Sequence, residues 1–387
     1  MNAFVYGNPT EILYGRGKLA EVGAAAKRFG TRALIVTTAA GGSSEASYLR
    51  TCEYLRQAGV EFTRFDGVRP NPTTDQVSEG AKIAKEFGAQ LVIGLGGGSA
   101  MDTAKAIAVE ATHPGTAWDY NCHTAGPGPE TLPIIAIGTT AGTGSQVTPC
   151  AVITKTSDQD KSAIWHPNIF PKVAIVDPDL TDSMPRSVTA QTGFDAFCHN
   201  FEAFLSKGAN PMVETLALDA FSRIAAFLPR AYNDGNDREA RDEMAWADTL
   251  GGLTNASGGV TLPHGLGMQV GGHAPWVSHG QALAAIYPAF TRYTRPAAVK
   301  KFAMAGRALD PTLAGVSDEE ASIGCCEAID RLLKSIDLWI GFDDLKVDDA
   351  NLRAIADCGQ VLGDYANNPR VATIEEMYDL LISCKKR

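Results

Sequence analysis

The chain has 387 residues and a mass of 40.9 kDa, with 45% hydrophobic and 20% charged residues. This length predicts two well-buried domains of roughly 200 residues each in an ordinary globular protein. The formal net charge is −10 and the sequence pI is about 5.2, with basic residues scattered along the chain. This pattern argues against nucleic acids and acidic membrane surfaces as partners, and leaves small polar molecules open.

The first residues, Met1 to Gly7, lack the charged and apolar regions of a secretory signal. No apolar run approaches the roughly 20 residues that span a bilayer. We therefore expect a cytoplasmic protein without a membrane partner. The cysteines include no C-x-x-C pair, so neither a disulfide framework nor a thiolate zinc site is expected.

Up to about Pro185, short apolar runs alternate with helical patterns. The periodicity predicts helices at residues 45–58 and 74–87. Such alternation is typical of a parallel sheet covered by helices on both faces. We therefore predict an α/β domain over residues 1–185. Its strands are expected at residues 33–36, 62–66, 91–95, 133–137, 151–153 and 173–176.

After Pro185 the β-branched runs largely disappear and long helical patterns dominate. Residues 186–387 are therefore predicted to form an all-α domain, with residues 178–185 as the hinge. The charged stretch at residues 234–248 is interpreted as a solvated helix surface. One helix face is marked by aromatic residues three or four positions apart: Phe194, Phe197, Phe201 and Phe204.

A glycine-rich turn, Gly96-Gly97-Gly98-Ser99, separates the predicted strand at 91–95 from the next helical pattern. Glycines let backbone N–H groups approach a pyrophosphate, and a helix N-terminus adds partial positive charge. The turn could hold a dinucleotide, although such turns are also a common structural device. A second loop, residues 138–145, is rich in small hydroxylic residues. Both loops should lie at the carboxyl edge of the sheet, where ligands bind in open α/β folds.

The adenosine ribose of a dinucleotide would lie at the turn after the first predicted strand, residues 37–44. This turn contains no acidic residue. A carboxylate there would favour NAD, because it would bond the ribose 2′-OH and repel a 2′-phosphate. Its absence leaves both NAD and NADP open.

A second set of residues has the composition of a metal site. Asp195 and His199 are four residues apart on a predicted helix and share one face, with Glu202 near that face. Two further histidines, His264 and His279, are each followed by glycine. Three imidazoles and one carboxylate suit Fe²⁺ or Zn²⁺ and leave a position open for a substrate oxygen. A lone D-x-x-x-H pair is common by chance, so the prediction depends on all four residues.

At these residues the sequence resembles the iron-containing (group III) alcohol dehydrogenase family. The resemblance implies an N-terminal α/β dinucleotide-binding domain with a parallel sheet and an all-α C-terminal metal-binding domain. It also implies a homodimer or a larger homo-oligomer. The matching motifs cover almost the whole chain, at residues 12–17, 96–105, 139–145, 193–199, 278–280 and 368–370.

The resemblance also implies roles for individual residues. The metal would be held by Asp195, His199, His264 and His279, with Fe²⁺ favoured and Zn²⁺ as the alternative. Asp195 and His264 are therefore also taken as catalytic. Cofactor contacts are implied for the two glycine-rich loops and the segment after Ile153, at Gly97, Gly98, Ser99, Asp102, Thr139, Thr140, Ser145 and Lys161.

The chain departs from the family pattern at Met268, at Thr38 and at Gln146, where the family usually has Glu. Met268 stands where the family often has a further histidine, so a proton-relay role for that histidine cannot be transferred. His273, between His264 and His279 in the sequence, is our candidate catalytic replacement. Thr38, a predicted cofactor contact, stands where NAD-preferring members usually have Asp.

These features predict an NAD(P)-dependent alcohol dehydrogenase or aldehyde reductase of class EC 1.1.1. It would interconvert a small primary alcohol and its aldehyde by hydride transfer. Two alternatives share the fold: a metal-free reductase like the maleylacetate reductases, and a lyase like the dehydroquinate synthases. The complete ligand set disfavours the first, and the Asp-His-His-His pattern differs from the ligands of the second.

Overall fold

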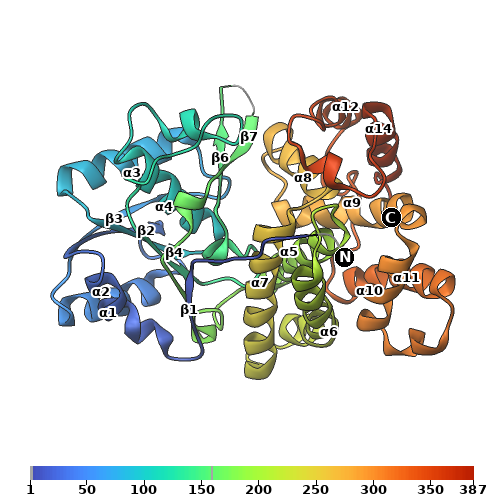
Figure 1. Cartoon of the computed structure of the whole chain (residues 1–387), viewed down its shortest axis with the longest axis horizontal. Coiled ribbons are helices and arrows are strands. Elements are labelled where there is room, and N and C mark those ends of the chain that lie inside the picture. The colour runs from blue at the N-terminus through green and yellow to red at the C-terminus, as the bar shows by residue number, and fades with distance from the viewer. Residues whose placement is uncertain (1–2, 158–159) are drawn as a thin grey trace. The chain divides into compact units, whose positions relative to one another are not determined.

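The computed structural model describes residues 3–157 and 160–387 (Figure 1). The described chain forms two compact units, Asn8–Met184 and Pro185–Arg387, and residues 3–7 group with the second. Among the helices that the structure describes, none combines the length and the apolar character that a membrane span requires.

The first unit is built on a six-stranded sheet in which every pairing is parallel. Its inner strands are almost entirely apolar and buried, as expected for a parallel sheet covered on both faces. The strand order is β1-β8-β5-β4-β2-β3. The strands are β1 (Glu11–Tyr14), β2 (Arg32–Thr38), β3 (Glu61–Val68), β4 (Leu91–Gly96), β5 (Ile134–Gly138) and β8 (Val173–Val176).

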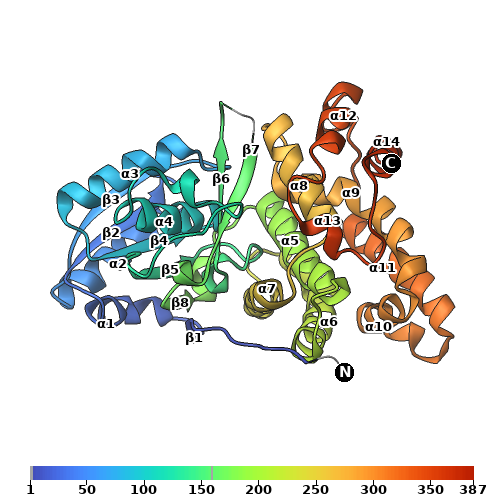
Figure 2. The ribbon, with the colours of Figure 1, turned by 45° about the horizontal axis from the view of Figure 1, so that its top comes forward.

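Helices cover both faces of this sheet (Figure 2). Successive side chains of β2 point to opposite faces, so Leu34 and Ile35 belong to different apolar cores. The Leu34 core includes residues of α3 (Thr74–Phe87) and α4 (Gly98–Glu110). The Ile35 core includes residues of α1 (Val22–Lys27) and α2 (Glu45–Gln57). The predicted fold, a helix-covered parallel sheet followed by a helical part, is confirmed.

The strand order reverses between β2 and β4. The chain passes from β2 to β3 on one side, and β4 then pairs with β2 on its other side. Ligands bind at such a switch point in open α/β sheets, beyond the carboxyl ends of the strands. Gly96 pairs with Gly138 in the β4–β5 register, so the two glycine-rich loops leave the sheet at the same level.

Two features of the first unit differ from the sequence prediction. Residues 151–153 do form a strand, β6 (Cys150–Lys155), but β6 lies outside the parallel sheet. It pairs antiparallel with β7 (Asp160–Trp165), which was not predicted. The edge strand β1 was also missed. Both missed strands are short and carry charged residues, so neither has the apolar run that marks a central strand.

The second unit is helical around α5, whose phenylalanines form the predicted buried face. Phe197 stacks on Phe201 with ring centroids 5.2 Å apart, and Phe204 meets Phe221 of α6 edge-on. The helices are α5 (Arg186–Leu205), α6 (Pro211–Asn233), α7 (Arg238–Gly258), α8 (Leu262–His273), α9 (His279–Thr294), α10 (Val299–Leu309), α11 (Asp318–Ser335), α12 (Asp349–Asp357), α13 (Asp364–Asn367) and α14 (Ile374–Ser383).

The interpretation of residues 234–248 as a solvated surface is wrong for their second half. Arg238 and Glu239 are exposed, whereas Arg241 and Asp248 on the same helix are buried. The Arg241 guanidinium donates to Thr189 Oγ1 at 2.8 Å and to the Gly235 carbonyl at 3.0 Å. Positions 241 and 248 are two helical turns apart and share one face. This face is packed in the protein even though it carries charged residues.

Candidate metal centre and cofactor loops

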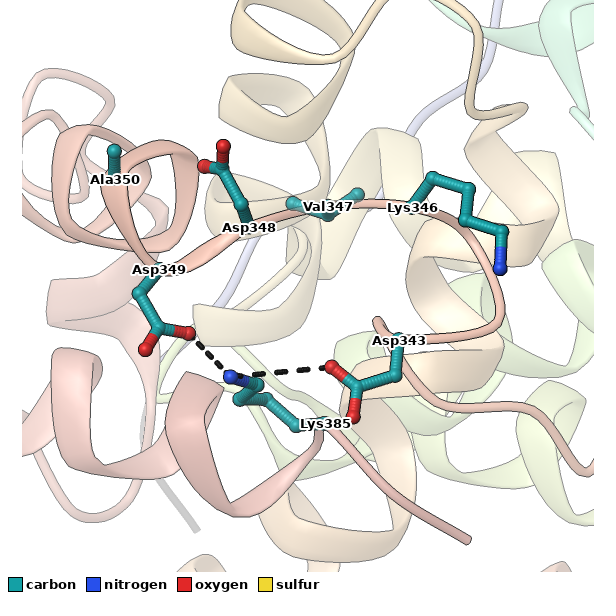
Figure 3. A pocket seen from close by; sticks show the side chains of 7 residues that line it. All are labelled: Asp343, Lys346, Val347, Asp348, Asp349, Ala350 and Lys385. Atoms are coloured by element: carbon teal, nitrogen blue, oxygen red, sulfur yellow. Dashed lines mark hydrogen bonds and ion pairs between the residues drawn. The ribbon is translucent and has the colours of Figure 1, made fainter.

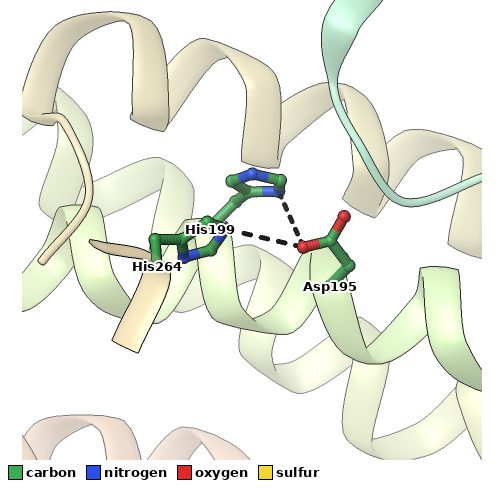
Figure 4. A group of neighbouring side chains, drawn as sticks. All are labelled: Asp195, His199 and His264. Carbon is green, nitrogen blue, oxygen red and sulfur yellow. Dashed lines mark ion pairs between the residues drawn. The ribbon is translucent and has the colours of Figure 1, made fainter. Parts of the chain in front are cut away.

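Three helices of the second unit bring the four predicted metal ligands together. Asp195 and His199 come from α5, His264 from α8 and His279 from α9. The nearest imidazole nitrogens lie 3.8 Å (His199), 3.5 Å (His264) and 3.7 Å (His279) from one oxygen, Asp195 Oδ1. Figure 4 shows Asp195, His199 and His264 pointing toward one another, and their donor atoms lie within 4.8 Å of one another.

The starts of α8 and α9 place two of these histidines. His264 lies in the first turn of α8, and His279 is the first residue of α9, where Ser278 forms a capping box. Close packing explains why glycine occupies position 280: a Cβ there would lie 2.6 Å from the Gln191 carbonyl oxygen of α5. The glycine after His279 therefore allows α9 to approach α5 closely enough for the histidine to reach Asp195.

The arrangement fits a divalent metal ion. Donor atoms bound about 2.1 Å from one tetrahedral ion lie about 3.4 Å apart, close to the separations around Asp195. Within the described residues, Asp195 Oδ1 and His264 Nε2 are buried without a hydrogen-bond partner. Leaving buried polar atoms unpaired is unfavourable, so an ion between them would supply the missing interaction. The site can therefore hold a metal that acts on an oxygen ligand.

Electrostatics favour a charged Asp195. Burial alone would raise the pKa of its carboxyl, but His199, His264 and His279 lower it to about 2. Burial alone would lower the pKa of His264, but Glu202 and Asp195 raise it to about 10. In the absence of a metal, a proton on His264 therefore occupies the position where a cation would bind.

Glu202 orients His264 from behind. Its side chain is fully buried on α5, and its Oε1 accepts from His264 Nδ1 at 2.7 Å. Tyr287 OH donates to the same oxygen at 3.1 Å, and Thr261 donates its N–H and Oγ1 to Oε2 at 2.9 and 3.2 Å. With Nδ1 bonded to Glu202, Nε2 faces Asp195. Such carboxylate–histidine pairs typically fix the tautomer and orientation of a metal ligand.

Asp364 of α13 lies close enough to His264 and Glu202 for both to influence its pKa, and it was not predicted from the sequence. Burial raises its pKa to about 6, His264 opposes the shift and Glu202 adds to it. A Cβ at Gly265 would lie 3.5 Å from the Asp364 Cβ, so α13 packs directly against α8. No local pattern could have indicated this residue, because α13 is a single turn far from α8 in the chain.

Met268, one departure from the family pattern, and His273, the candidate replacement, both lie on α8. Met268 is buried one turn after His264. His273 is the last residue of the helix and is half-buried. Its catalytic role stays a prediction.

In the first unit, the two glycine-rich loops lie side by side. Thr139 donates its backbone N–H to the Gly96 carbonyl at 2.9 Å. A Cβ at Gly98 would lie 2.7 Å from Thr143, and one at Gly97 would lie 3.3 Å from Thr140. Since α4 begins at Gly98, its first unpaired amides open at this junction. A helix N-terminus of this kind is a typical binding position for a pyrophosphate.

Ser99, Asp102 and Ser145 have partners within the protein. The Ser99 carbonyl accepts from Thr103 Oγ1. Asp102 Oδ1 accepts from Ser145 Oγ at 2.6 Å, and Oδ2 accepts from the Val152 N–H at 3.1 Å. Asp102 thus ties α4 to the second loop and to β6.

Lys105 was not predicted as a site residue from the sequence. Its side chain is fully buried, and Nζ donates to the carbonyls of Ser145, Thr148 and Cys150 and to Ser145 Oγ, at 2.6 to 3.1 Å. Burial lowers the pKa of Lys105 and raises that of Asp102, and the 3.9 Å between the two charges opposes both shifts. Its position one turn after Asp102 was the available signal.

The remaining predicted cofactor residues are more scattered. Thr38 ends β2, and within the described chain its Oγ1 and that of Thr140 are buried without hydrogen-bond partners. Lys161 lies on β7, where Nζ donates to Asn71 Oδ1 at 2.8 Å. The Lys161 charge nevertheless opposes the rise that burial causes in the pKa of Asp102.

A surface pocket of about 650 Å³ in the second unit holds none of the predicted site residues (Figure 3). Lys385 points between Asp343 and Asp349 and forms ion pairs with both. Lys385 thus pairs with two of the three carboxylates in the lining, and the metal centre is the stronger candidate site. The pocket is lined by Asp343, Lys346, Val347, Asp348, Asp349, Ala350 and Lys385.

We predict that Glu202→Gln lowers the affinity for Zn²⁺ by about 10- to 100-fold. The amide has one accepting oxygen instead of two, so it cannot accept from both Thr261 and Tyr287 as the carboxylate does. His264 also loses its charged orienting partner. Competition with a chromophoric chelator measures the affinity. Glu214→Gln on α6, which removes a partly exposed carboxylate paired with Lys301, is the matched control and should bind normally. Equal affinities of the two variants would contradict the positioning role.

We also predict that metal affinity rises with pH. With its pKa raised to about 10, His264 is protonated at neutral pH, so each bound ion must displace that proton. Asp195, with a pKa of about 2, is already charged in this range and does not add to the change of metal affinity with pH. Affinity should increase about tenfold per pH unit between about pH 6 and pH 8. Zn²⁺ titration calorimetry in two buffers should detect the released proton, and a pH-independent affinity would exclude this coupling.

Comparison with known proteins agrees with both units. Residues 9–178 match the family described as iron-containing alcohol dehydrogenase, and residues 189–384 match the C-terminal part of the Fe-containing alcohol dehydrogenase family. The NAD-dependent methanol dehydrogenase of Bacillus methanolicus is 32% identical over 373 residues, which are 96% of this chain and 97% of that protein. The 1,3-propanediol dehydrogenase of Klebsiella pneumoniae is 33% identical over 381 residues, 97% of each protein.

The structural likeness is equally extensive. A mutant of an archaeal halo-thermophilic alcohol dehydrogenase from a Red Sea brine pool matches with a TM-score of 0.95 and 34% identity. The match covers 99% of this chain and 100% of that chain. The family resemblance drawn from the motifs is therefore confirmed, and the chain belongs to the iron-containing alcohol dehydrogenase family.

Proposed function

We propose that this protein is a metal-dependent NAD(P) oxidoreductase that interconverts a small primary alcohol and its aldehyde. The observation that carries the proposal is the convergence of three imidazoles on Asp195 Oδ1 in a buried site. In the reaction, alcohol and NAD(P)⁺ give aldehyde, NAD(P)H and a proton. Methanol and 1,3-propanediol, the substrates in the names of two relatives, are both small primary alcohols and support this substrate class.

Asp195, His199, His264 and His279 would hold the metal, with Fe²⁺ favoured by the family and Zn²⁺ as the alternative. When bound, such an ion supplies a Lewis acid that polarises the alcohol or carbonyl oxygen of the substrate. The chain's own contribution is preorganisation. Glu202 fixes the His264 ring, and the negative charge of Asp195 is matched by imidazoles rather than by mobile water.

The cofactor would bind the first unit, with its pyrophosphate at the junction of the two glycine-rich loops. Gly97 and Gly98 let the second loop pack closely against the start of α4, and the first amides of α4 would bond the pyrophosphate. Thr139 and Thr140, from the second glycine-rich loop, would line the other side of the bound pyrophosphate. Since both Asp102 oxygens accept from the protein, we assign Asp102 and Ser145 to holding the loop in its binding shape. Thr38 and Lys161 stay proposed contacts.

A metal-free reductase on the same fold is the second candidate. It would have no use for a buried carboxylate facing three histidines, or for a glutamate dedicated to orienting one of them. Such polar groups are costly to bury unless they bind something. The geometry therefore favours the metal-dependent reaction. Net consumption of NADH or NADPH separates either reductase from a lyase that regenerates its cofactor.

We expect protein purified anaerobically and loaded with Fe²⁺ or Zn²⁺ to reduce short aldehydes with NADH or NADPH. Removal of the metal, or His199→Ala, should lower turnover by about 10³-fold, because several kcal/mol of transition-state stabilisation is lost. His123→Ala, which removes an exposed histidine from the first unit, is the control and should be fully active. Full turnover by metal-free protein would move the assignment to the metal-free branch.

A catalytic role for His273 makes a separate prediction. If His273 transfers the proton that the family histidine would carry, His273→Ala should lower kcat and change the pH dependence of kcat, with metal content unchanged. His113→Ala is a poor control because His113 is bonded on both ring nitrogens, whereas His166→Ala removes a histidine that only caps a turn. An unchanged pH–rate profile in His273→Ala would rule this role out.

A further inference from the structure

We propose that Asp66 and Glu45, two carboxylates from outside the β2–α2 turn, make this enzyme select NAD over NADP. The inference rests on the proposed function, because it assumes that a dinucleotide binds the first unit. It assigns a chemical preference that the sequence left open when Thr38 was found in place of an acidic residue.

The turn lies beside the phosphate-binding junction. A Cβ at Gly96 would lie 4.0 Å from Ser44 Oγ, so the end of the β2–α2 turn borders the loop that follows β4. On the other side of β2 is β3, the edge strand of the sheet. A dinucleotide with its pyrophosphate at α4 would therefore place its adenosine ribose at residues 38–44, between the ends of β2 and β3.

Both carboxylates bond the backbone of this turn. Asp66, at the end of β3, accepts the Ala40 N–H through Oδ2 at 3.3 Å. Glu45, the first residue of α2, accepts the Gly41 N–H through Oε2 at 3.0 Å. Successive free amides in a glycine-rich turn are the donors that commonly bind phosphate. Here those two amides already face carboxylates, so a 2′-phosphate would meet negative charge where it needs donors.

Arg64 lies beside the turn, and its guanidinium already has partners. Its guanidinium pairs with Glu45 at 2.9 Å, donates to Thr37 Oγ1 at 2.9 Å and lies over the Tyr48 ring with its Cζ 3.9 Å from the ring centroid. Arg64 and the Gly41 amide lower the pKa of Glu45, which keeps this carboxylate charged at neutral pH. Among the three side chains Arg64, Glu45 and Asp66, one guanidinium faces two carboxylates, so these three together carry a net charge of −1.

The neutral ribose 2′-OH of NAD meets no such repulsion. Thr38 Oγ1, at the end of β2, is buried and has no hydrogen-bond partner within the described residues. It can bond a ribose hydroxyl. The acid that NAD-preferring relatives carry on β2 is thus replaced by acids on β3 and α2, which reach the same turn through the backbone.

Binding of NADH and NADPH to the full-length protein, followed by the cofactor's own fluorescence, tests the proposal without turnover. We expect NADH to bind the wild type at least about tenfold more tightly than NADPH. Asp66→Asn is nearly isosteric and can still accept the Ala40 N–H, so it should tighten NADPH binding several-fold and leave NADH unchanged. Glu45→Gln should act in the same direction, and Asp66→Asn with Glu45→Gln should add to it.

Glu53→Gln is the matched control, since it removes an exposed carboxylate from the same helix, α2, and should not alter the NADH to NADPH ratio. Arg64→Gln tests the opposite assignment, in which Arg64 binds a 2′-phosphate. Selective loss of NADPH binding in Arg64→Gln, or a wild type that prefers NADPH, would overturn the proposal. Binding of both cofactors with a ratio insensitive to Asp66→Asn would also overturn it. Failure of both cofactors to bind would instead contradict the proposed function itself.

Discussion

The helical unit depends on one electrostatic constraint: two carboxylates, Asp195 and Glu202, are buried on the same helix. Burying either charge alone would be strongly unfavourable. His264 resolves the conflict because it lies between them, with Nδ1 at 2.7 Å from Glu202 and Nε2 at 3.5 Å from Asp195. The start of α8, which carries His264 and Thr261, is therefore held against α5 by the same groups that shape the metal centre. The contacts of His264 with Glu202 and Asp195 therefore both hold α8 against α5 and set the positions of the predicted ligands.

The α/β unit solves a similar problem with one buried cation. Lys105 has no exposed surface, and its ammonium is surrounded by three carbonyl oxygens and two hydroxyls from the segment between β5 and β6 and from the first residue of β6. This segment follows the second glycine-rich loop and has little regular structure of its own. A single lysine on α4 thus fixes the loop relative to the helix whose N-terminus would receive the pyrophosphate. A loop rich in glycine and serine can still form a defined site here, because its bonds to the buried Lys105 ammonium favour one loop conformation over the others.

Much of this organisation could be predicted from the sequence wherever the signal is local. The helix predicted at residues 74–87 is α3, because Thr73 and Gln76 form a capping box and Gly88 ends the helix in a left-handed conformation. The four candidate ligands were recognised by residue type, and the structure brings them together at Asp195. Their function as metal ligands stays a prediction. Long-range features were missed: β7 exists only through its pairing with β6, and Asp364 reaches the centre only because α13 packs on α8.

The acids around the β2–α2 turn show most clearly why a linear reading was incomplete. The turn itself has no acidic residue, which kept NADP open, yet its Ala40 and Gly41 amides are bonded by Asp66 and Glu45. The Glu45–Gly41 contact is local and spans four residues, whereas the Asp66 contact does not follow from spacing, since Asp66 is adjacent only through the pairing of β3 with β2. Cofactor preference is set by the field around a phosphate and not by the identity of one position. A carboxylate supplied by a neighbouring strand can therefore replace one on the strand itself, and a family motif that lacks its acid need not have lost the preference.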